Sequence, residues 1–253
     1  LVPERVLFDA SKDHLKLREF TPDQVLERQV ARAMRASDET AGQTSSSSTT
    51  AQEFLAAIAS SDPVPGGGSV SAYAGALSSA LVRMVAGLTI GRKKYAAVEP
   101  EMTIVATNAE QLAENLSRLV ERDADAYAAV SAAYKLPKES ESAQSARKDA
   151  ITKALLGAAE IPLETARFCA QAAELAASVA AKGNSNAVTD AGVAALLASA
   201  GCQGAAFNVR INVASLDDRS AGQRLEEEAL RLVRAADAHA REACALVEKA
   251  LSN

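Results

Sequence analysis

Apolar side chains recur every three to four positions along most of this chain, which is the spacing of one face of an α-helix. Runs of β-branched residues, which favour strands, are scarce. The pattern predicts six helices, at about 51–60, 69–90, 98–134, 142–181, 189–213 and 221–251. We therefore expect an all-α protein, built as a bundle of about six mostly long helices.

Individual residues refine these helices. Pro162 lies inside the fourth predicted helix, where it removes one backbone hydrogen bond, so we expect a kink or a break there. Gly183 is expected to cap the same helix at its C-terminus. The last predicted helix carries a seven-residue repeat, which predicts a packing seam. Its two rows are Leu225, Leu232, His239 and Leu246, and then Ala229, Ala236, Ala243 and Ala250.

The second predicted helix follows two prolines and three glycines, in the stretch SDPVPGGGSVSAYAGALSSALVRMVAGLT (61–89). Small side chains form a stripe along it, at Ser69, Ala72, Ala76 and Ala80. Such a stripe lets a neighbouring helix pack closely, or it leaves room for a flat ligand. Close packing is the more common explanation, and the spacing by itself does not separate the two.

The N-terminal part of the chain has a different character. Residues 1–35 predict a separate segment of two short amphipathic helices. Residues 36–50, ASDETAGQTSSSSTT, are small and polar, and such a segment buries too little apolar surface to offset the entropy of ordering it. We expect a flexible linker there and a compact helical domain over 51–253.

Composition narrows the class of protein. Hydrophobic residues make up 48% of the chain but aromatic residues only 4%, so the apolar content is mostly Ala and Leu, the strongest helix formers. A net charge of -5 argues against a general nucleic-acid surface. No apolar run is expected to span a membrane, because Arg83, Arg92 and similar residues interrupt the candidates. Neither nucleic acid nor a membrane is therefore an expected partner.

The cysteines and histidines indicate the redox environment of the protein and whether it binds a metal. Cys169, Cys202 and Cys244 lie far apart and form no CxxC pair, which favours free thiols in a reducing cytoplasm. With only His14 and His239 present, no metal site is expected. No signal peptide is visible, although the chain does not begin with Met, which leaves room for a segment upstream.

Two motifs flank the second predicted helix. PGGGS (65–69) precedes its N-terminus, where exposed amides and the helix dipole favour an anion, although a plain glycine turn also explains the motif. GRKKY (91–95) follows its C-terminus. The three cations there complement the helix dipole, or they collect a ligand that carries carboxylates.

Three further motifs place polar side chains within later helices. ERDADAY (121–127) puts a carboxylate and a tyrosine four residues apart on one helix face. In GNSNAVTDAG (183–192), Thr189 or Asp190 is expected to be an N-cap. FNVRIN (207–212) puts two asparagines one turn apart in an apolar stretch. Buried amides need hydrogen-bond partners, so these two asparagine side chains bond the backbone or bind a polar heterocycle.

The ordered set of motifs resembles the cyclodeaminase domain of the formiminotransferase-cyclodeaminase family, which includes stand-alone methenyltetrahydrofolate cyclohydrolases. The resemblance covers nearly all of 50–253, and the set is specific although no single motif is. The first segment, LVPERVLFDASKDHLKLREF, also resembles the end of a formiminotransferase domain, which implies the C-terminal part of a fused, bifunctional protein. The motifs are PVPGGGSVSAYAGALSSALVRMVAGLT, GRKKY, RDADAY followed by KLPK, IPLETA, GNSNAVTDAGVAA and GAAFNVRIN.

The resemblance implies a homodimer that binds a tetrahydrofolate derivative in a cleft at or near the subunit interface, with no other cofactor. The reaction implied first is that of a formiminotetrahydrofolate cyclodeaminase, an activity of histidine degradation, in which a ring closes, ammonia leaves and methenyltetrahydrofolate forms. The alternative is a cyclohydrolase, in which water attacks the methenyl carbon. The formiminotransferase-like first segment favours the cyclodeaminase, because a fused partner would make its substrate.

The chemistry of the implied reaction, applied to these motifs, suggests hypothetical roles for individual residues. Asp190 and Asp123 are candidates for proton transfer or for stabilising the cationic amidine. Lys94 is a candidate at the reacting centre, or it joins Arg92 and Lys93 in binding the glutamate tail of the folate. Two non-enzymatic alternatives stay open, a folate-binding module without turnover and a structural helical dimer. The residues expected to contact the rest of the substrate are Gly66, Gly67, Gly68, Ser69, Tyr127, Asn184, Asn208 and Asn212.

Overall fold

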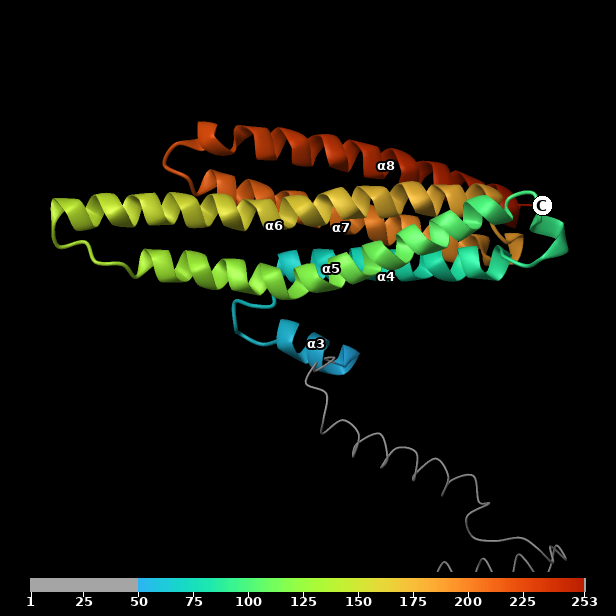
Figure 1. Cartoon of the computed structure of the whole chain (residues 1–253), viewed down its shortest axis with the longest axis horizontal. Coiled ribbons are helices and arrows are strands. Elements are labelled where there is room, and N and C mark those ends of the chain that lie inside the picture. Colours follow the sequence, from blue (N-terminus) through green and yellow to red (C-terminus); the bar gives the residue numbers. More distant parts are fainter. Residues whose placement is uncertain (1–49, 253) are drawn as a thin grey trace, which may run out of the picture. The chain divides into compact units, whose positions relative to one another are not determined.

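Figure 1 shows a computed structural model of the chain, which describes residues 50–252. The chain divides into two units, Leu1–Phe54 and Leu55–Asn253, and the second unit holds the helical bundle. The predicted first segment (1–35) and the predicted linker, apart from its last residue, lie outside the described residues.

Six α-helices make up most of residues 50–252, and this part of the chain contains no strand. The predicted all-α class is therefore confirmed, and each predicted helix agrees with an observed one to within two residues at either end. The α-helices are α3 (Ala51–Ile58), α4 (Gly67–Thr89), α5 (Glu99–Tyr134), α6 (Glu141–Lys182), α7 (Val188–Ala214) and α8 (Gln223–Leu251). Short 3₁₀ helices, η2 (Lys93–Tyr95), η3 (Ser185–Ala187) and η4 (Arg219–Gly222), lie in the connections.

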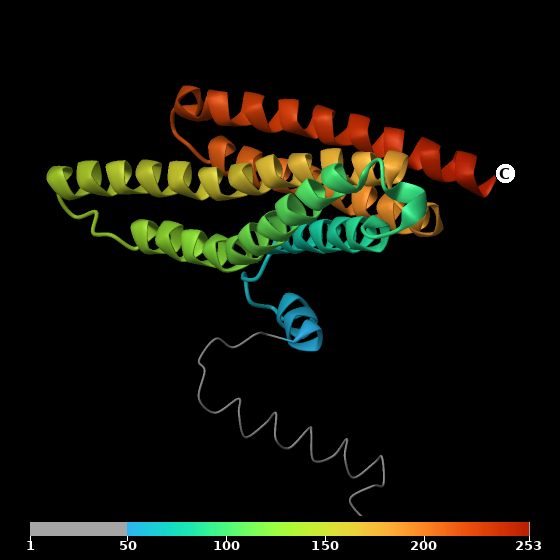
Figure 2. The same cartoon turned by 45° about the vertical axis from the view of Figure 1, so that its right-hand side comes forward.

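The five long helices α4 to α8 run alongside one another in both views (Figures 1 and 2). α7 packs against α4, α6 and α8, and α5 packs against α4 and α6. Their apolar faces meet in two buried clusters, one around Leu116 and Leu163 and the other around Val82 and Met102. Burial of these faces stabilises the bundle, because each fully buried Leu, Val or Met contributes about 1.5–3 kcal/mol.

Small residues on α4 serve close helix packing. A Cβ added at Gly75 would come within 2.6 Å of Cys169 Sγ on α6, and one at Gly201 on α7 would come within 2.8 Å of the Ser71 carbonyl oxygen. Larger side chains at these positions would force the helices apart. Of the predicted stripe, Ser69, Ala72 and Ala76 are buried against neighbouring helices, whereas Ala80 is exposed. On this face, protein fills the space that a flat ligand would need.

The two features predicted for the fourth helix have different outcomes. α6 continues through Pro162 without interruption, so the predicted break does not occur. Gly183 caps α6 as predicted, and its amide donates to the Val179 carbonyl oxygen at 2.9 Å. The seam predicted on α8 packs against α6 and α7. It is buried at Ala229, Leu232, Ala236 and Ala243, and exposed at Ala250 near the helix end.

Two segments are long and apolar enough to cross a membrane by length and composition, Gly67–Thr89 and Ser185–Ala214. The expectation that charged residues would interrupt every such run is therefore wrong. The best windows of these segments are 50% and 56% buried inside the bundle, and core helices of soluble proteins pass the same test. Their apolar character is thus explained in large part by packing within this fold.

Candidate functional site

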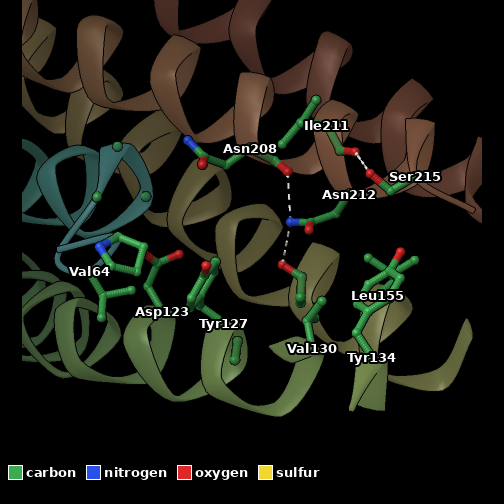
Figure 3. Close-up of a pocket in the computed structure, with 16 residues that line it drawn as sticks. Val64, Asp123, Tyr127, Val130, Tyr134, Leu155, Asn208, Ile211, Asn212 and Ser215 are labelled. Carbon is green, nitrogen blue, oxygen red and sulfur yellow. Dashed lines mark hydrogen bonds between the residues drawn. The ribbon is translucent and has the colours of Figure 1, made fainter. Parts of the chain in front are cut away.

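A pocket of about 330 Å³ lies between the first turn of α4, the second half of α5, the middle of α6 and the last turns of α7 (Figure 3). It brings together most of the predicted substrate-binding residues. Among the side chains that line it, only that of Asp123 is charged. The lining residues are Pro63, Val64, Gly66, Gly67, Gly68, Asp123, Ala126, Tyr127, Val130, Tyr134, Leu155, Ala158, Asn208, Ile211, Asn212 and Ser215.

The Asp123 carboxylate lies against the first turn of α4. Ser69 donates a hydrogen bond from its hydroxyl to Asp123 Oδ2 at 3.0 Å. A Cβ added at Gly68 would overlap the carboxylate, whereas one at Gly67 would meet only Asn208 Nδ2, at 3.5 Å. The close approach therefore depends on Gly68. The positive end of the α4 dipole, which the sequence suggested for an anionic ligand, already faces a carboxylate of the protein.

The surroundings of Asp123 change its ionisation. Burial raises the pKa of this carboxyl above its ordinary value of 3.8, and the hydrogen bonds from the hydroxyl and amide of Ser69 offset only part of the rise. A carboxyl with a raised pKa, held in a mostly apolar pocket, is suited to gain and lose a proton during a reaction. Within residues 50–252, no group of three or more His, Cys, Asp or Glu could hold a metal ion.

Two asparagines of α7 line the opposite wall of the pocket (Figure 3). Asn208 Nδ2 donates to the Gly204 carbonyl oxygen at 2.8 Å. Asn212 Nδ2 donates to the carbonyl oxygens of Ala158 at 3.0 Å and Asn208 at 2.9 Å. Both amide nitrogens thus bond the backbone, which is one of the two predicted outcomes. Their Oδ1 atoms accept no hydrogen bond from residues 50–252, so the pocket retains two neutral acceptors.

A second polar group lies at the other end of α4, where Lys94 and Tyr95 meet η3. Lys94 Nζ lies 3.2 Å from Ser185 Oγ and 5.0 Å from the centre of the Tyr95 ring. The Ser185 amide donates to Tyr95 Oη at 2.9 Å. Hydrogen bonds from Ser185, and then from Lys94, lower the pKa of Tyr95 to about 8. Sequence reasoning missed Tyr95 as an ionisable candidate, and its place directly after three cations was the available signal.

Asn184 and Asp190 belong to this second group but differ in their contacts. Asn184 Nδ2 donates to the Leu88 carbonyl oxygen at 2.9 Å, which ties the start of α7 to the end of α4. Asp190 is half-buried in the first turn of α7, and its carboxylate forms no hydrogen bond or ion pair with the other side chains and backbone groups of residues 50–252. The N-cap of α7 is Ala187, so the predicted capping by Thr189 or Asp190 is wrong.

The length of α4 separates the Asp123 pocket from the cluster of Lys94, Tyr95 and Ser185. Its 23 residues span ~35 Å at 1.5 Å per residue. Arg92, Lys93 and Lys94 therefore lie far from the glycine turn of the same chain. Arg92 and Lys93 are exposed, and neither forms an ion pair within the part of the chain that the structure describes.

Comparison with known proteins identifies the relatives of this chain. The family model described as Formiminotransferase-cyclodeaminase matches residues 50–231. A methenyltetrahydrofolate cyclohydrolase of Methylorubrum extorquens is 45% identical over 179 residues, which cover 70% of this chain and 86% of that protein. A formimidoyltransferase-cyclodeaminase of Rattus norvegicus is 33% identical over 165 residues, which cover 65% of this chain and 30% of that protein. The crystal structure of a formiminotetrahydrofolate cyclodeaminase from Thermotoga maritima matches with a TM-score of 0.72 and 30% identity, covering 79% of this chain and 96% of that one.

The fold and these matches define a class, helical enzymes that act on the one-carbon unit of a tetrahydrofolate derivative. The chain belongs to the formiminotransferase-cyclodeaminase family, and the resemblance seen in its motifs is confirmed. The matched region spans 30% of the rat protein, whose name joins two activities.

Proposed function

We propose that this chain is a methenyltetrahydrofolate cyclohydrolase. The observation that carries the proposal is the half-buried Asp123 carboxylate in a pocket whose lining holds no other charge. The methenyl bridge of the substrate is a cation, an amidinium spread over two nitrogens and one carbon, and a lone carboxylate is its electrostatic complement. The name of the 45% identical relative supports the same choice. The cyclodeaminase, which the motifs and the first segment favoured, becomes the second candidate.

In the proposed reaction a water molecule attacks the methenyl carbon. A carbon–oxygen bond forms, and the Asp123 carboxylate accepts a proton from the water. The hydroxyl group of this adduct then gives up its proton to solvent as the bond from the carbon to N5 breaks, N5 takes up one proton, and the formyl group stays on N10. One water is consumed and one proton is released, so the step needs no oxidant or reductant.

The remaining pocket residues position the substrate. The Oδ1 atoms of Asn208 and Asn212 accept hydrogen bonds from N–H groups of the pterin, and neutral acceptors add no competing charge beside Asp123. The rings and aliphatic groups of Tyr127 and Ile211 offer apolar contact to the aminobenzoyl ring. Holding the methenyl carbon beside Asp123 and a water in a near-attack geometry supplies part of the rate enhancement.

The cyclodeaminase remains the second candidate because the structural relative from Thermotoga maritima has that name. Both reactions act on the same carbon, and a protonated Asp123 could deliver the proton that departing ammonia needs. Offering the purified chain each substrate separately tests the choice by the methenyl absorbance. A cyclohydrolase removes that absorbance from methenyltetrahydrofolate, whereas a cyclodeaminase generates it from formiminotetrahydrofolate. Failure with both substrates would contradict either enzyme and favour a folate-binding or structural module.

We also propose that two copies of the chain pair through an exposed apolar face of α4 and α7. These helices pack side by side, and a large apolar surface on one folded unit marks an interaction site. In the predicted dimer, a second copy of the chain covers this face. Its exposed residues are Val70, Leu77, Met84 and Leu88 on α4 and Val193, Leu196, Phe207 and Ile211 on α7.

Antiparallel pairing on this face would place candidate residues from the two ends of α4 close together, each end coming from a different copy. Asp123 stands at one end of α4, and Lys94 with Tyr95 stands at the other. A two-fold axis across the middle of α4 therefore brings Lys94 and Tyr95 of a second copy to the Asp123 pocket of the first. This arrangement supports the role suggested for Lys94, which in a single chain is separated from the glycine turn by the ~35 Å length of α4. It also supports the role suggested for Asp190, which lies ~27 Å along α7 from Asn208 of its own chain.

A further inference from the structure

The structure places the Ser69 side chain outside the Asp123 pocket. Ser69 is fully buried in the first turn of α4, and it does not line the pocket, although the three glycines before it do. A hydroxyl in this position acts on a reaction only through another group. That group is Asp123, because no other side chain of residues 50–252 forms a hydrogen bond with its carboxylate.

The Ser69 hydroxyl is fixed between two acceptors on α5. Its Oγ lies 3.0 Å from Asp123 Oδ2 and 3.1 Å from the Val120 carbonyl oxygen. Because the second acceptor is backbone, the Ser69 oxygen keeps its position when the charge of Asp123 changes. A Cβ added at Gly68 would overlap the carboxylate, so the carboxyl group is also confined against α4.

The two oxygens of the Asp123 carboxylate therefore differ. Oδ2 accepts from the Ser69 hydroxyl, whereas Oδ1 accepts from no side chain of residues 50–252. Figure 3 shows the carboxyl group beside Tyr127, turned into the pocket. A proton taken up on Oδ1 leaves Oδ2 free to go on accepting from Ser69, because a protonated carboxyl retains an acceptor oxygen. The carboxyl thus keeps its orientation while it gains and loses a proton.

We propose that Ser69 is a positioning residue of the reaction, which holds Oδ2 of Asp123 against α4 so that Oδ1 accepts the proton of the attacking water. The inference rests on the proposed function, in which Asp123 is the proton acceptor. It gives Ser69 a partner within the protein in place of the substrate contact suggested from the sequence. The same hydrogen bond favours the charged form of the carboxyl, which is the form that accepts a proton.

The charged and titratable groups around Asp123 leave this role to Ser69. Burial raises the pKa of the carboxyl, and the Ser69 hydroxyl, followed by the Ser69 amide, lowers it. The loop before α4, α4 itself, α6 and α7 add no titratable side chain to the pocket lining, and α5 adds only two tyrosines besides Asp123. Arg122 and Asp125, which flank Asp123 on α5, line a separate groove. Removing the hydroxyl should therefore raise the pKa of Asp123 further.

Nuclear magnetic resonance of the Asp123 carboxyl carbon tests the proposal without any substrate. In Ser69→Ala the pKa of this carboxyl should move upward, and Asp123→Asn assigns the resonance. Ser71→Ala is the matched control, because it removes another buried hydroxyl near the start of α4, whose hydrogen bond of 2.7 Å goes to the Gly67 carbonyl oxygen. That variant should leave the pKa of Asp123 in place. An unchanged pKa in a folded Ser69→Ala variant would overturn the proposal, as would an equal shift in Ser71→Ala.

The pH dependence of kcat/KM for methenyltetrahydrofolate separates positioning from a purely structural role. In Ser69→Ala the acidic limb of the profile should move to higher pH, with kcat/KM roughly tenfold lower on that limb. Ser71→Ala should keep the acidic limb of the parent. An equal loss at every pH would leave Ser69 with a structural role only and overturn the proposal. An upward pKa shift in Ser69→Ala without turnover of any methenyl substrate would keep Ser69 as the residue that positions Asp123 and refute the cyclohydrolase.

Discussion

Asn212 donates a hydrogen bond to the Ala158 carbonyl oxygen at 3.0 Å, and this bond replaces one that the backbone of α6 cannot make. In an α-helix the carbonyl of Ala158 would accept from the amide of residue 162, but Pro162 has no amide hydrogen. A side chain of α7 therefore supplies the missing donor where α6 continues through its proline. The same residue lines the pocket, so the integrity of α6 and the geometry of the site are coupled.

The first prediction tests this coupling by a double-mutant cycle. Asn212→Ala should lower the free energy of unfolding by about 1–3 kcal/mol, because it leaves a buried carbonyl without a donor. Pro162→Ala restores the backbone donor, so in that background the same change should cost about 1 kcal/mol less. Urea unfolding monitored by circular dichroism gives the four values. Asn208→Ala, which loses only a bond within α7, is the control, and equal costs of Asn212→Ala in both backgrounds would contradict the account.

The second prediction concerns the glycine turn. Gly68→Ala should destabilise the protein by about 2 kcal/mol or more, because its Cβ would overlap the Asp123 carboxylate. Gly67→Ala adds the same methyl group one residue earlier, where the nearest neighbour is 3.5 Å away, so its stability should stay within about 0.5 kcal/mol of the parent. Thermal unfolding of both variants makes the comparison. Equal losses would show that the glycines serve only backbone flexibility.

The third prediction concerns Asp123 as the proton acceptor. Asp123→Asn keeps the size of the side chain but removes the charge, and it should lower kcat by roughly a hundredfold or more. Asp125→Asn, two residues away and exposed, should leave kcat near the parent value. A folded Asp123→Asn variant with more than half of the parent rate would remove Asp123 from the chemistry.

Stability as a function of pH gives an independent readout of the same carboxyl. Burial raises the folded pKa of Asp123 above its ordinary value of 3.8, so the protonated form is favoured in the folded state. Its contribution to stability is fully present below pH 3.8 and is lost as the pH rises through the higher folded pKa. Asp123→Asn should therefore gain stability relative to the parent across that interval. Parallel curves for the two proteins would mean that the carboxyl is not perturbed.

Much of the fold follows from the sequence because helix signals are local. The period of apolar residues fixed each helix to within two residues, and Gly183 marked the end of α6. Of the kink or break predicted at Pro162, the break does not occur, because Asn212, fifty positions away along the chain, supplies the compensating donor. Sequence rules for a single helix predict the hydrogen bond that proline removes. They do not predict that a side chain from another helix supplies a replacement donor.

More of the candidate site could have been predicted from helix lengths alone, namely which residues lie at the same end of α4. α4 has 23 residues, and α5 returns antiparallel after a short connection, so the twenty-fifth residue of α5, Asp123, falls level with Gly67 at the start of α4. The same count places GRKKY at the far end. The bonding of Asn212 depends on side-chain packing between helices, which spacing along one helix does not encode.

The fourth prediction concerns Tyr95. Difference absorbance near the tyrosinate band should show one tyrosine that ionises at pH about 8, because Ser185 and Lys94 favour its anion. Ser185→Ala should move this ionisation toward the ordinary value of 10, and Tyr95→Phe should abolish it. Tyr134→Phe is the control, since it leaves the Ser185 contacts intact. A titration that persists at the same pH in Tyr95→Phe would assign it to another tyrosine.

The last prediction tests whether the site is completed by a second copy. Light scattering should report a dimer at micromolar concentration, and Leu77→Glu with Phe207→Glu should convert it to a monomer by placing charge on the exposed face of α4 and α7.

If Tyr95 and Lys94 act in the partner's pocket, Asp123→Asn and Lys94→Ala should each be nearly inactive alone. Mixing them under conditions that exchange subunits should restore activity, because each mixed dimer holds one site with both residues intact. Asp123→Asn mixed with Asp123→Asn is the control for the mixing itself. A constant low rate after verified exchange would sink the shared site, and full activity in the monomeric Leu77→Glu, Phe207→Glu variant would show that the Asp123 pocket works alone.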